Sequence, residues 1–161
     1  MHVVLHEPEI HYNAGNIGRT CAVTGCKLHL IEPLGFSLED KYIKRAGMDY
    51  WYDLDITRYV NYEEFILKNG GADVYMATTK GGVPYTEARY PPDVFLLFGK
   101  ESAGIPEHIL KQNRDKCVRI PMLAGKRSLN LANAVAVIVY EALRQNGFFN
   151  LVARSAALTR E

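Results

Sequence analysis

Short apolar runs alternate with segments in which an apolar residue recurs every three or four positions, along almost the whole chain. Runs that are apolar at successive positions are typical of strands buried on both faces of a parallel sheet. The other segments have the periodicity of helices that bury one face. The predicted strands are HVVLHE (2–7), KLHLIEP (27–33), DVYMATT (73–79), VFLLFG (94–99) and CVRIP (117–121).

Capping and turn residues mark the ends of the predicted helices. A turn with Asn13 and Gly15 precedes the first of them, and Gly25 ends it. Asn61 is placed to cap a later helix. A brief extended piece, DYWYDLDI (49–56), completes the prediction. The predicted helices are NIGRTCAVTG (16–25), SLEDKYIKRAG (37–47), NYEEFILKNG (61–70), IPEHILKQN (105–113) and LNLANAVAVIVYEALRQNG (129–147).

The alternation of strands and helices predicts an α/β fold, a mainly parallel sheet flanked by helices. With 161 residues the chain is long enough for one domain with a real core. We expect residues 1–150 to form that domain and residues 151–161 to be a C-terminal tail. No internal repeat or linker interrupts the pattern.

Composition narrows the function classes only slightly. The formal net charge is +1, so an RNA-binding surface must be a local cluster of cations. The N-terminus carries charge within seven residues, and the longest apolar run, AVAVIV (134–139), is too short to cross a bilayer. Cys21, Cys26 and Cys117 lack the spacing of a zinc site or a disulfide framework. A cytoplasmic protein without membrane contact is therefore expected.

Candidate chemistry lies in three loops. In an open parallel sheet, ligands bind beyond the carboxyl ends of the strands, so the loops that leave those ends are the places to search. Three of these loops hold clusters of polar residues and glycine: EPEIHYNAGNIGRT (7–20), FGKESAGIP (98–106) and IPMLAGKRSLNLAN (120–133).

Taken alone, the residues of these loops leave several interpretations open. Ser128 and Asn130 stand at the start of the last helix, where they either cap it or help its free N–H groups bind an anion. Gly99 lets a flat ligand approach the backbone. Glu101 and Arg19 are, in isolation, more typical of solvated surface charges. No P-loop, dinucleotide fingerprint, metal-ligand spacing or nucleophile elbow is present. The residues alone thus indicate a small ligand of the nucleotide class.

In order, N-x-G-N-I-x-R-x-C (13–21), L-L-F-G-K-E-S-x-G-I-P (96–106) and I-P-M-x-x-x-x-x-S-L-N-L-A-N (120–133) resemble the three signature motifs of the SPOUT superfamily of RNA methyltransferases. EPEI (7–10), HLIEPLGF (29–36), KRAGMDY (44–50) and ATTKG (77–81) also match, so the resemblance spans residues 2–150. It is strongest to the branch that methylates the ribose 2′-hydroxyl of the wobble pyrimidine (position 34) of bacterial tRNA. It implies S-adenosylmethionine as methyl donor, no metal, and a deep C-terminal trefoil knot.

The resemblance also assigns roles. It implies a homodimer that packs through the last helix, with small residues at Ala132, Ala134 and Ala136, and the anticodon stem-loop of tRNA as partner. The residues expected to act on the ribose are Arg19, Asn13, Glu101, Ser128 and Asn130. Those expected to hold the cofactor are Ala77, Thr78, Gly99, Ile120, Met122, Ser128 and Leu129.

Side-chain chemistry refines these roles. A guanidinium pKa lies above about 12, so Arg19 is expected to clamp a phosphate and stabilise a developing oxyanion rather than act as a base. Phosphate contacts are expected from Lys41, Lys44, Arg45, Lys126 and Arg127. Base stacking is considered for Tyr12, Tyr50 and Trp51, with plain packing as the alternative for each.

The chain departs from the motif pattern at two places. His11 and Tyr12 stand where a proline-containing pair is expected, and Ala103 replaces a larger polar residue. Two other functions remain open at this stage. One is 2′-O-methylation of rRNA or of another tRNA position, and the other is a non-catalytic module that binds nucleotide or RNA.

Overall fold

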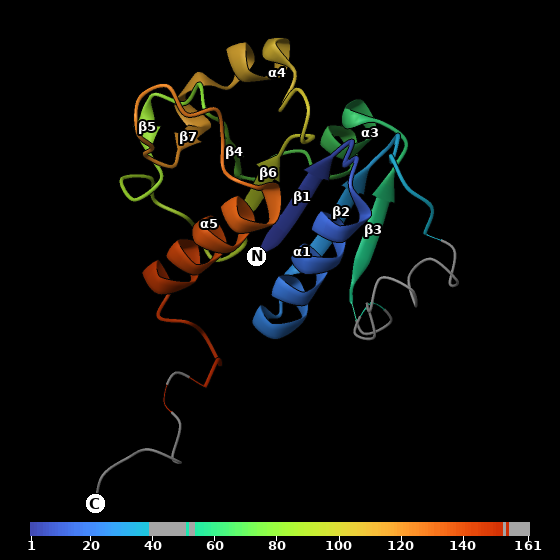
Figure 1. The fold of residues 1–161 in the computed structure, drawn as a ribbon. Helices are drawn as coiled ribbons and strands as arrows, with labels where there is room; N and C mark the ends of the chain where they lie inside the picture. Colours follow the sequence, from blue (N-terminus) through green and yellow to red (C-terminus); the bar gives the residue numbers. More distant parts are fainter. Residues whose placement is uncertain (39–50, 52–53, 153, 155–161) are drawn as a thin grey trace, which may run out of the picture.

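A computed structural model of the chain describes residues 1–38, 51, 54–152 and 154. Within these residues seven strands form one sheet in the order β3-β2-β1-β6-β4-β7-β5, and each pair of neighbours is parallel. The prediction of an α/β fold with a parallel sheet is confirmed (Figure 1). The strands are β1 (His2–His6), β2 (Lys27–Ile31), β3 (Ile56–Tyr59), β4 (Val74–Ala77), β5 (Val83–Pro84), β6 (Phe95–Phe98) and β7 (Cys117–Arg119).

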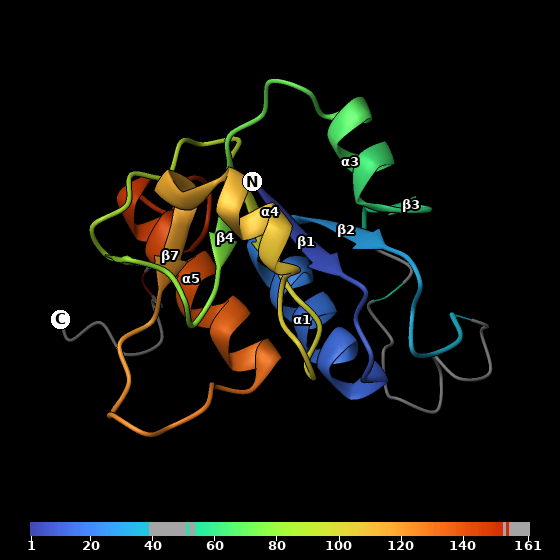
Figure 2. The ribbon, with the colours of Figure 1, turned by 90° about the horizontal axis from the view of Figure 1, so that it is seen from above.

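Helices cover both faces of the sheet. α1 (His11–Thr24) and α5 (Leu131–Gln145) pack together on one face, and α3 (Tyr62–Lys68) and α4 (Glu107–Gln112) lie on the other (Figure 2). A 3₁₀ turn, Arg114–Lys116, leads into β7. Among the described residues, none of the helices has the length and apolar character that crossing a membrane requires.

Alternate side chains of each central strand enter two separate cores, as the period of two along a strand requires. In β1, Val3 and Leu5 pack toward α1 and α5, whereas Val4 packs toward α3 and α4. In β6, Leu96 belongs to the first core and Leu97 to the second. Burial on both faces is the reason why these strands have almost continuous apolar runs.

Several predicted ends are confirmed. Gly25 follows α1 in the left-handed conformation, with a φ of 70°, which glycine adopts without strain. The Asn61 side chain caps α3 by accepting a hydrogen bond from the Glu64 N–H at 2.8 Å. The predicted helix over 37–47, apart from residues 37 and 38, and half of the extended piece over 49–56 lie outside the described residues.

Other predicted bounds are wrong. α1 begins at His11, so Asn13 and Gly15 lie inside the helix and not in a turn before it. The strands β3 and β5 are missing from the predicted pattern, since β3 is mixed in polarity and β5 has only two residues. Trp51 is buried, with 6% of its surface exposed, and contacts the helix at Gly18, so it packs in the core and does not stack on RNA.

The order of the strands reverses direction between β1 and β6. From β1 the chain moves through α1 to β2 on one side, and from β6 it moves through α4 to β7 on the other. The connections therefore leave these two neighbouring strands in opposite directions. Such a reversal opens a crevice at the carboxyl ends of the strands, where α/β proteins bind ligands.

The α3–α4 face contains a chain of hydrogen-bonded polar rings, of which His29 and Tyr59 are buried and His2 is partly buried. His2 Nδ1 lies 2.8 Å from His29 Nε2, and His29 Nδ1 lies 2.9 Å from the Tyr59 hydroxyl. His29 is 4% exposed, and the ring of His2 stacks on Phe95 at 4.0 Å. Burial lowers the pKa of both histidines to about 4. Both rings are therefore neutral in the folded protein at neutral pH.

We expect this pair to make the fold sensitive to acid. Between about pH 6.5 and pH 4 the unfolded chain takes up protons that the folded protein refuses, so the free energy of unfolding falls as the pH falls. For His29 the loss amounts to about 3 kcal/mol, and above pH 6.5 the pair contributes no pH dependence. Urea unfolding at pH 7.5 and pH 4.5 measures the difference.

Replacing His29 by glutamine is expected to remove the part of that pH dependence that His29 contributes, because an amide keeps hydrogen-bonding groups and does not titrate, while His2 still titrates. The exposed His108 provides the matched control, since His108→Gln is expected to leave the pH dependence as in the parent chain. Equal acid sensitivity of the parent chain and His29→Gln would contradict the assignment.

Candidate functional site

A cleft of about 490 Å³ lies at the carboxyl ends of β4, β6 and β7, between the N-terminal ends of α1 and α5. Its volume falls in the range of small-molecule sites, about 300–1,000 Å³. All residues predicted to hold a cofactor line it: Ala77, Thr78, Gly99, Ile120, Met122, Ser128 and Leu129. The three loops singled out in the sequence therefore meet in space.

A chain of side-chain hydrogen bonds joins these loops. The Asn130 side chain caps α5, accepting from the Ala132 N–H at 2.9 Å and the Asn133 N–H at 3.3 Å. Its amide donates to Asn13 Oδ1 at 2.9 Å, and the Asn13 amide donates to Glu101 Oε1 at 2.9 Å. One of the two interpretations of Asn130, the helix cap, is thus confirmed.

Asn13 is the buried centre of this chain. It is 6% exposed, and both ends of its amide are hydrogen-bonded. A buried amide with both ends satisfied is held in one orientation, because losing either partner would leave a polar atom unpaired at a cost of about 1–3 kcal/mol. Asn13 therefore fixes the relative positions of α1, α5 and the loop after β6.

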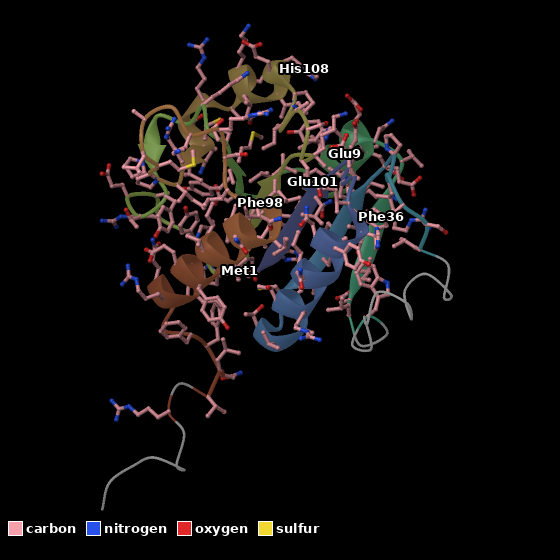
Figure 3. All side chains as sticks on the ribbon, in the orientation of Figure 1. Met1, Glu9, Phe36, Phe98, Glu101 and His108 are labelled. Carbon is pink, nitrogen blue, oxygen red and sulfur yellow. The ribbon has the colours of Figure 1, made fainter. Side chains whose placement is uncertain are left out.

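Hydrogen bonds to the carboxylates of two glutamates join the loop after β1 to the loop after β6. Glu101 accepts from the Glu9 N–H at 2.9 Å and the Ile10 N–H at 3.3 Å. Glu9 in turn accepts from the N–H and the hydroxyl of Ser102, at 2.9 and 2.8 Å. These bonds from Ser102 lower the pKa of the Glu9 carboxyl. Figure 3 labels Glu9 and Glu101 near each other at this edge of the sheet.

The position of Glu101 suits its charge. Its carboxylate binds backbone N–H groups at the start of α1, where the helix dipole favours a negative group. Lys100 forms an ion pair with Glu7 at 2.8 Å, and this hydrogen bond raises the pKa of Lys100. The acceptor capacity of Glu101 is largely used within the protein, so its role is to hold the two loops together.

Gly99 is required by the loop that follows it. A Cβ at this position would lie 2.1 Å from the Ile105 nitrogen and 2.2 Å from the Gly104 carbonyl carbon. The loop turns back at Gly104, which has a φ of 72° and donates to the Lys100 carbonyl at 2.9 Å. From the sequence, Gly99 was predicted to let a flat ligand approach the backbone. The structure adds a second reason for glycine here, because the backbone at Gly104 and Ile105 leaves no room for a Cβ.

Arg19 lies apart from the other predicted catalytic residues. Asn13, Glu101, Ser128 and Asn130 line the cleft, but Arg19 does not. It is exposed on the outward face of α1, almost two turns from Asn13. The cleft of one chain thus forms without Arg19, and the catalytic role of this arginine stays a prediction.

Some cleft residues were absent from the predicted site. Ile10, Ile105, Leu110 and Ala134 add apolar surface, and Lys80 adds a cation beside the predicted Arg127. In the sequence, the match of the ATTKG segment (77–81) to the family pattern could have indicated Lys80. The predicted cations Lys41, Lys44 and Arg45, and also Tyr50, lie outside the described residues. In the part of the chain that the structure describes, no group of three or more histidine, cysteine or carboxylate residues could hold a metal ion.

Comparison with known proteins agrees with this geometry. The model of the SpoU rRNA Methylase family matches residues 1–140. The tRNA (cytidine(34)-2′-O)-methyltransferase of Aeromonas hydrophila is 48% identical over 91% of this chain and 94% of its own length.

Two solved structures have the same fold. One, which gives structural insights into the 2-OH methylation of C/U34 on tRNA, is 46% identical, with a TM-score of 0.84 over 91% of this chain and 95% of that chain. The other, an AdoMet-bound rRNA methyltransferase from Sinorhizobium meliloti, is 31% identical, with a TM-score of 0.77 over 89% of this chain and 55% of that chain. The chain described here belongs to the SpoU rRNA Methylase family.

Proposed function

We propose that this chain transfers the methyl group of S-adenosylmethionine to the ribose 2′-hydroxyl of the pyrimidine at wobble position 34 of tRNA. The observation that carries the proposal is the hydrogen-bonded chain Asn130–Asn13–Glu101, which joins the three motif loops around one cleft. Family membership and the activity named for the Aeromonas relative support it.

The cleft fits a nucleoside cofactor. Ile120, Leu129 and Ile105 supply apolar surface for the faces of a purine, and Thr78 and Ser128 supply hydroxyl groups. A small-molecule site needs this combination of apolar walls and few polar groups. When bound, S-adenosylmethionine supplies a methyl group on a sulfonium. The residues that would hold it are those predicted from the motifs.

We also propose that the active enzyme is a homodimer. Arg19 faces outward on α1 and does not line the cleft of its own chain, and a second copy of the chain would bring Arg19 to a cleft. The outer face of α5 carries the exposed apolar side chains of Val137 and Tyr140. Exposed apolar side chains on one helix face support an interface between proteins at that face.

The trefoil knot belongs to the same proposal. The connection from β4 to β6 passes beyond β7, where it forms β5, and the chain after β7 then returns to pack α5 against α1 and β6. A knot of the SPOUT type requires the returning segment to thread through such a loop.

We further propose one domain over residues 1–150, a tail over 151–161 and a cytoplasmic location, where tRNA is present.

The protein's contribution to catalysis would be mainly alignment. Methyl transfer to a hydroxyl is an in-line displacement, and a positioned pair of reactants gains rate without a metal or a covalent intermediate. Asn13 and Glu101 hold the loops that define the geometry. Arg19 would bind the phosphate beside the target ribose and stabilise negative charge on the 2′-oxygen, while a phosphate oxygen accepts the proton.

Cations near the cleft would bind the RNA backbone. Lys80 and Arg127 line the cleft, and Lys126 is exposed on the same loop as Arg127. With a net charge of only +1, the protein depends on this local group for phosphate contacts. Affinity for tRNA should therefore decrease as the salt concentration increases.

A methyl-transfer assay tests the function. The purified protein, labelled S-adenosylmethionine and bulk tRNA are expected to give labelled tRNA, and nucleoside mapping is expected to find 2′-O-methylated pyrimidine at position 34. A Thr78→Trp variant, whose indole occupies the cleft, is expected to be inactive. Leu67→Ala, an exposed change on α3, is the control that should keep activity.

Each other result would overturn part of the proposal. Label in rRNA, or at another tRNA position, would move the substrate to the alternative that the sequence left open. Binding of the cofactor and tRNA without methyl transfer would make the protein a binding module. No binding of S-adenosylmethionine at all would reject the site.

A further inference from the structure

Two aromatic side chains stand at the start of α1, outside the cleft. The rings of His11 and Tyr12 lie 4.1 Å apart between centroids at an angle of 36°, and Tyr12 is 63% exposed. The residues on either side of this pair, Ile10 and Asn13, both line the cleft. The two rings therefore form an aromatic surface at the rim of the site.

This aromatic surface continues into a polar face of the same helix. Tyr12, Asn16 and Arg19 follow one another at spacings of four and three residues, so they share one side of α1. All three are exposed. Tyr12 and Arg19 are separated along the helix axis by about 10 Å, which is the length of two to three stacked nucleotides at about 3.4 Å each.

An exposed ring, an amide and a guanidinium in a row match the groups of a single RNA strand. Proteins bind unpaired bases by stacking them on aromatic rings, and they bind the backbone between them with arginine. A ring that is 63% exposed has most of its surface available for such stacking. A peptide partner could pack against the ring, but its backbone carries no phosphate for the guanidinium of Arg19 to bind.

We propose that Tyr12, supported by His11, is the stacking platform for an unpaired base that neighbours the methylated nucleotide, while Arg19 binds the backbone on the same face. The inference rests on the proposed function, because it takes the substrate to be the anticodon loop of tRNA.

The test measures RNA affinity separately from turnover. Fluorescence anisotropy with a synthetic anticodon stem-loop gives Kd for the parent chain, Tyr12→Ala and Tyr12→Phe. Loss of one stacked base is expected to raise Kd about tenfold in Tyr12→Ala. Tyr12→Phe is expected to bind like the parent, because it keeps the ring. The dependence of log Kd on log salt should be the same in Tyr12→Ala as in the parent, since no charge is lost.

An abasic nucleotide identifies the stacked base. Two further stem-loops each lack one of the two bases that flank position 34. For one of them, Kd for the parent is expected to be about tenfold higher than for the complete stem-loop. Tyr12→Ala is expected to bind that abasic RNA and the complete RNA with the same Kd. Such non-additivity is the coupling that a direct contact produces. Leu67→Ala, far from the cleft, should respond to every RNA as the parent does.

The possible failures are distinct. Equal Kd values for Tyr12→Ala and the parent overturn the role of Tyr12. If the parent still methylates the RNA, the proposed function is unaffected by that result. A change of oligomeric state in Tyr12→Ala, measured by light scattering, overturns that role too, because the ring would then contact a second copy of the chain. A parent chain that binds the stem-loop without methylating it rejects the function, and the Kd comparison still decides the role of Tyr12.

Discussion

Replacing Arg19 by alanine is expected to slow single-turnover methyl transfer by about 10²- to 10³-fold, the usual effect of removing a group that stabilises a developing oxyanion. Binding of S-adenosylmethionine should be unchanged, because Arg19 does not line the cleft of its own chain. Arg19→Lys should restore only part of the rate, since an ammonium keeps the charge without the planar pair of donors that binds phosphate. Rapid-quench kinetics with excess enzyme measure the chemical step, and calorimetry measures cofactor binding.

Mixed dimers show which subunit the arginine serves. An Arg19→Ala subunit keeps an intact cleft, and a Thr78→Trp subunit keeps an intact arginine, so each variant alone is expected to be inactive. If Arg19 acts in the partner's cleft, mixing the two restores activity in one site of each mixed dimer. If it acts within its own chain, mixing restores nothing. Full activity of the Arg19→Ala dimer would remove Arg19 from the mechanism.

The second large effect is expected at Gly99. A Gly99→Ala chain must displace the backbone at Gly104 or Ile105, which lies within 2.2 Å of the new Cβ. Forced overpacking of this kind costs about 1–3 kcal/mol of stability. The displaced loop carries Glu101, so the hydrogen bonds to Glu9 and Asn13 should be lost with it. Cofactor binding by calorimetry is expected to become undetectable, with a lower urea midpoint.

Gly82→Ala is the matched control for this change. Nothing lies within 4 Å of a Cβ at Gly82, and its φ is not in the left-handed region. We expect this variant to bind S-adenosylmethionine and to unfold in urea as the parent does. A Gly99→Ala chain with normal cofactor affinity would show that the loop after β6 does not form the cofactor site.

The sequence predicts those parts of the fold that depend on local pattern. β1 and β6 are apolar at successive positions because both of their faces are buried, and this signal is present in a few adjacent residues. β5 has only two residues, so its pairing with β7 depends on the path of the chain and not on its own side chains. No local pattern could have predicted it.

The start of α1 shows a second limit. Asparagine and glycine favour turns, so Asn13 and Gly15 indicated a loop. In the structure the Asn13 side chain is bonded to Glu101 and Asn130, which lie 88 and 117 residues further along the chain, and it no longer competes with the helix backbone. Tertiary contacts of this range override local preference and are not visible in a single sequence.

The same limit applies to the site. The motif loops were predicted to meet, and they do, because parallel strands end at one edge of the sheet. The part played by Glu9 was not predicted, since its partner Ser102 is 93 residues away. The position of Arg19 outside the cleft could not be predicted either, because periodicity shows that a residue faces away from the core but not which surface it serves.

The hydrogen bond between Asn13 and Asn130 limits how far the site can form while the chain is being synthesised on the ribosome. Asn13 is synthesised 117 residues before Asn130, one of its two side-chain partners. The strands of the described sheet all precede Asn130 along the chain, so a nascent chain can assemble the sheet before this partner is made. The Asn13 amide oxygen gains its hydrogen-bond donor, and the cleft gains its last loop, only when the segment around Asn130 emerges.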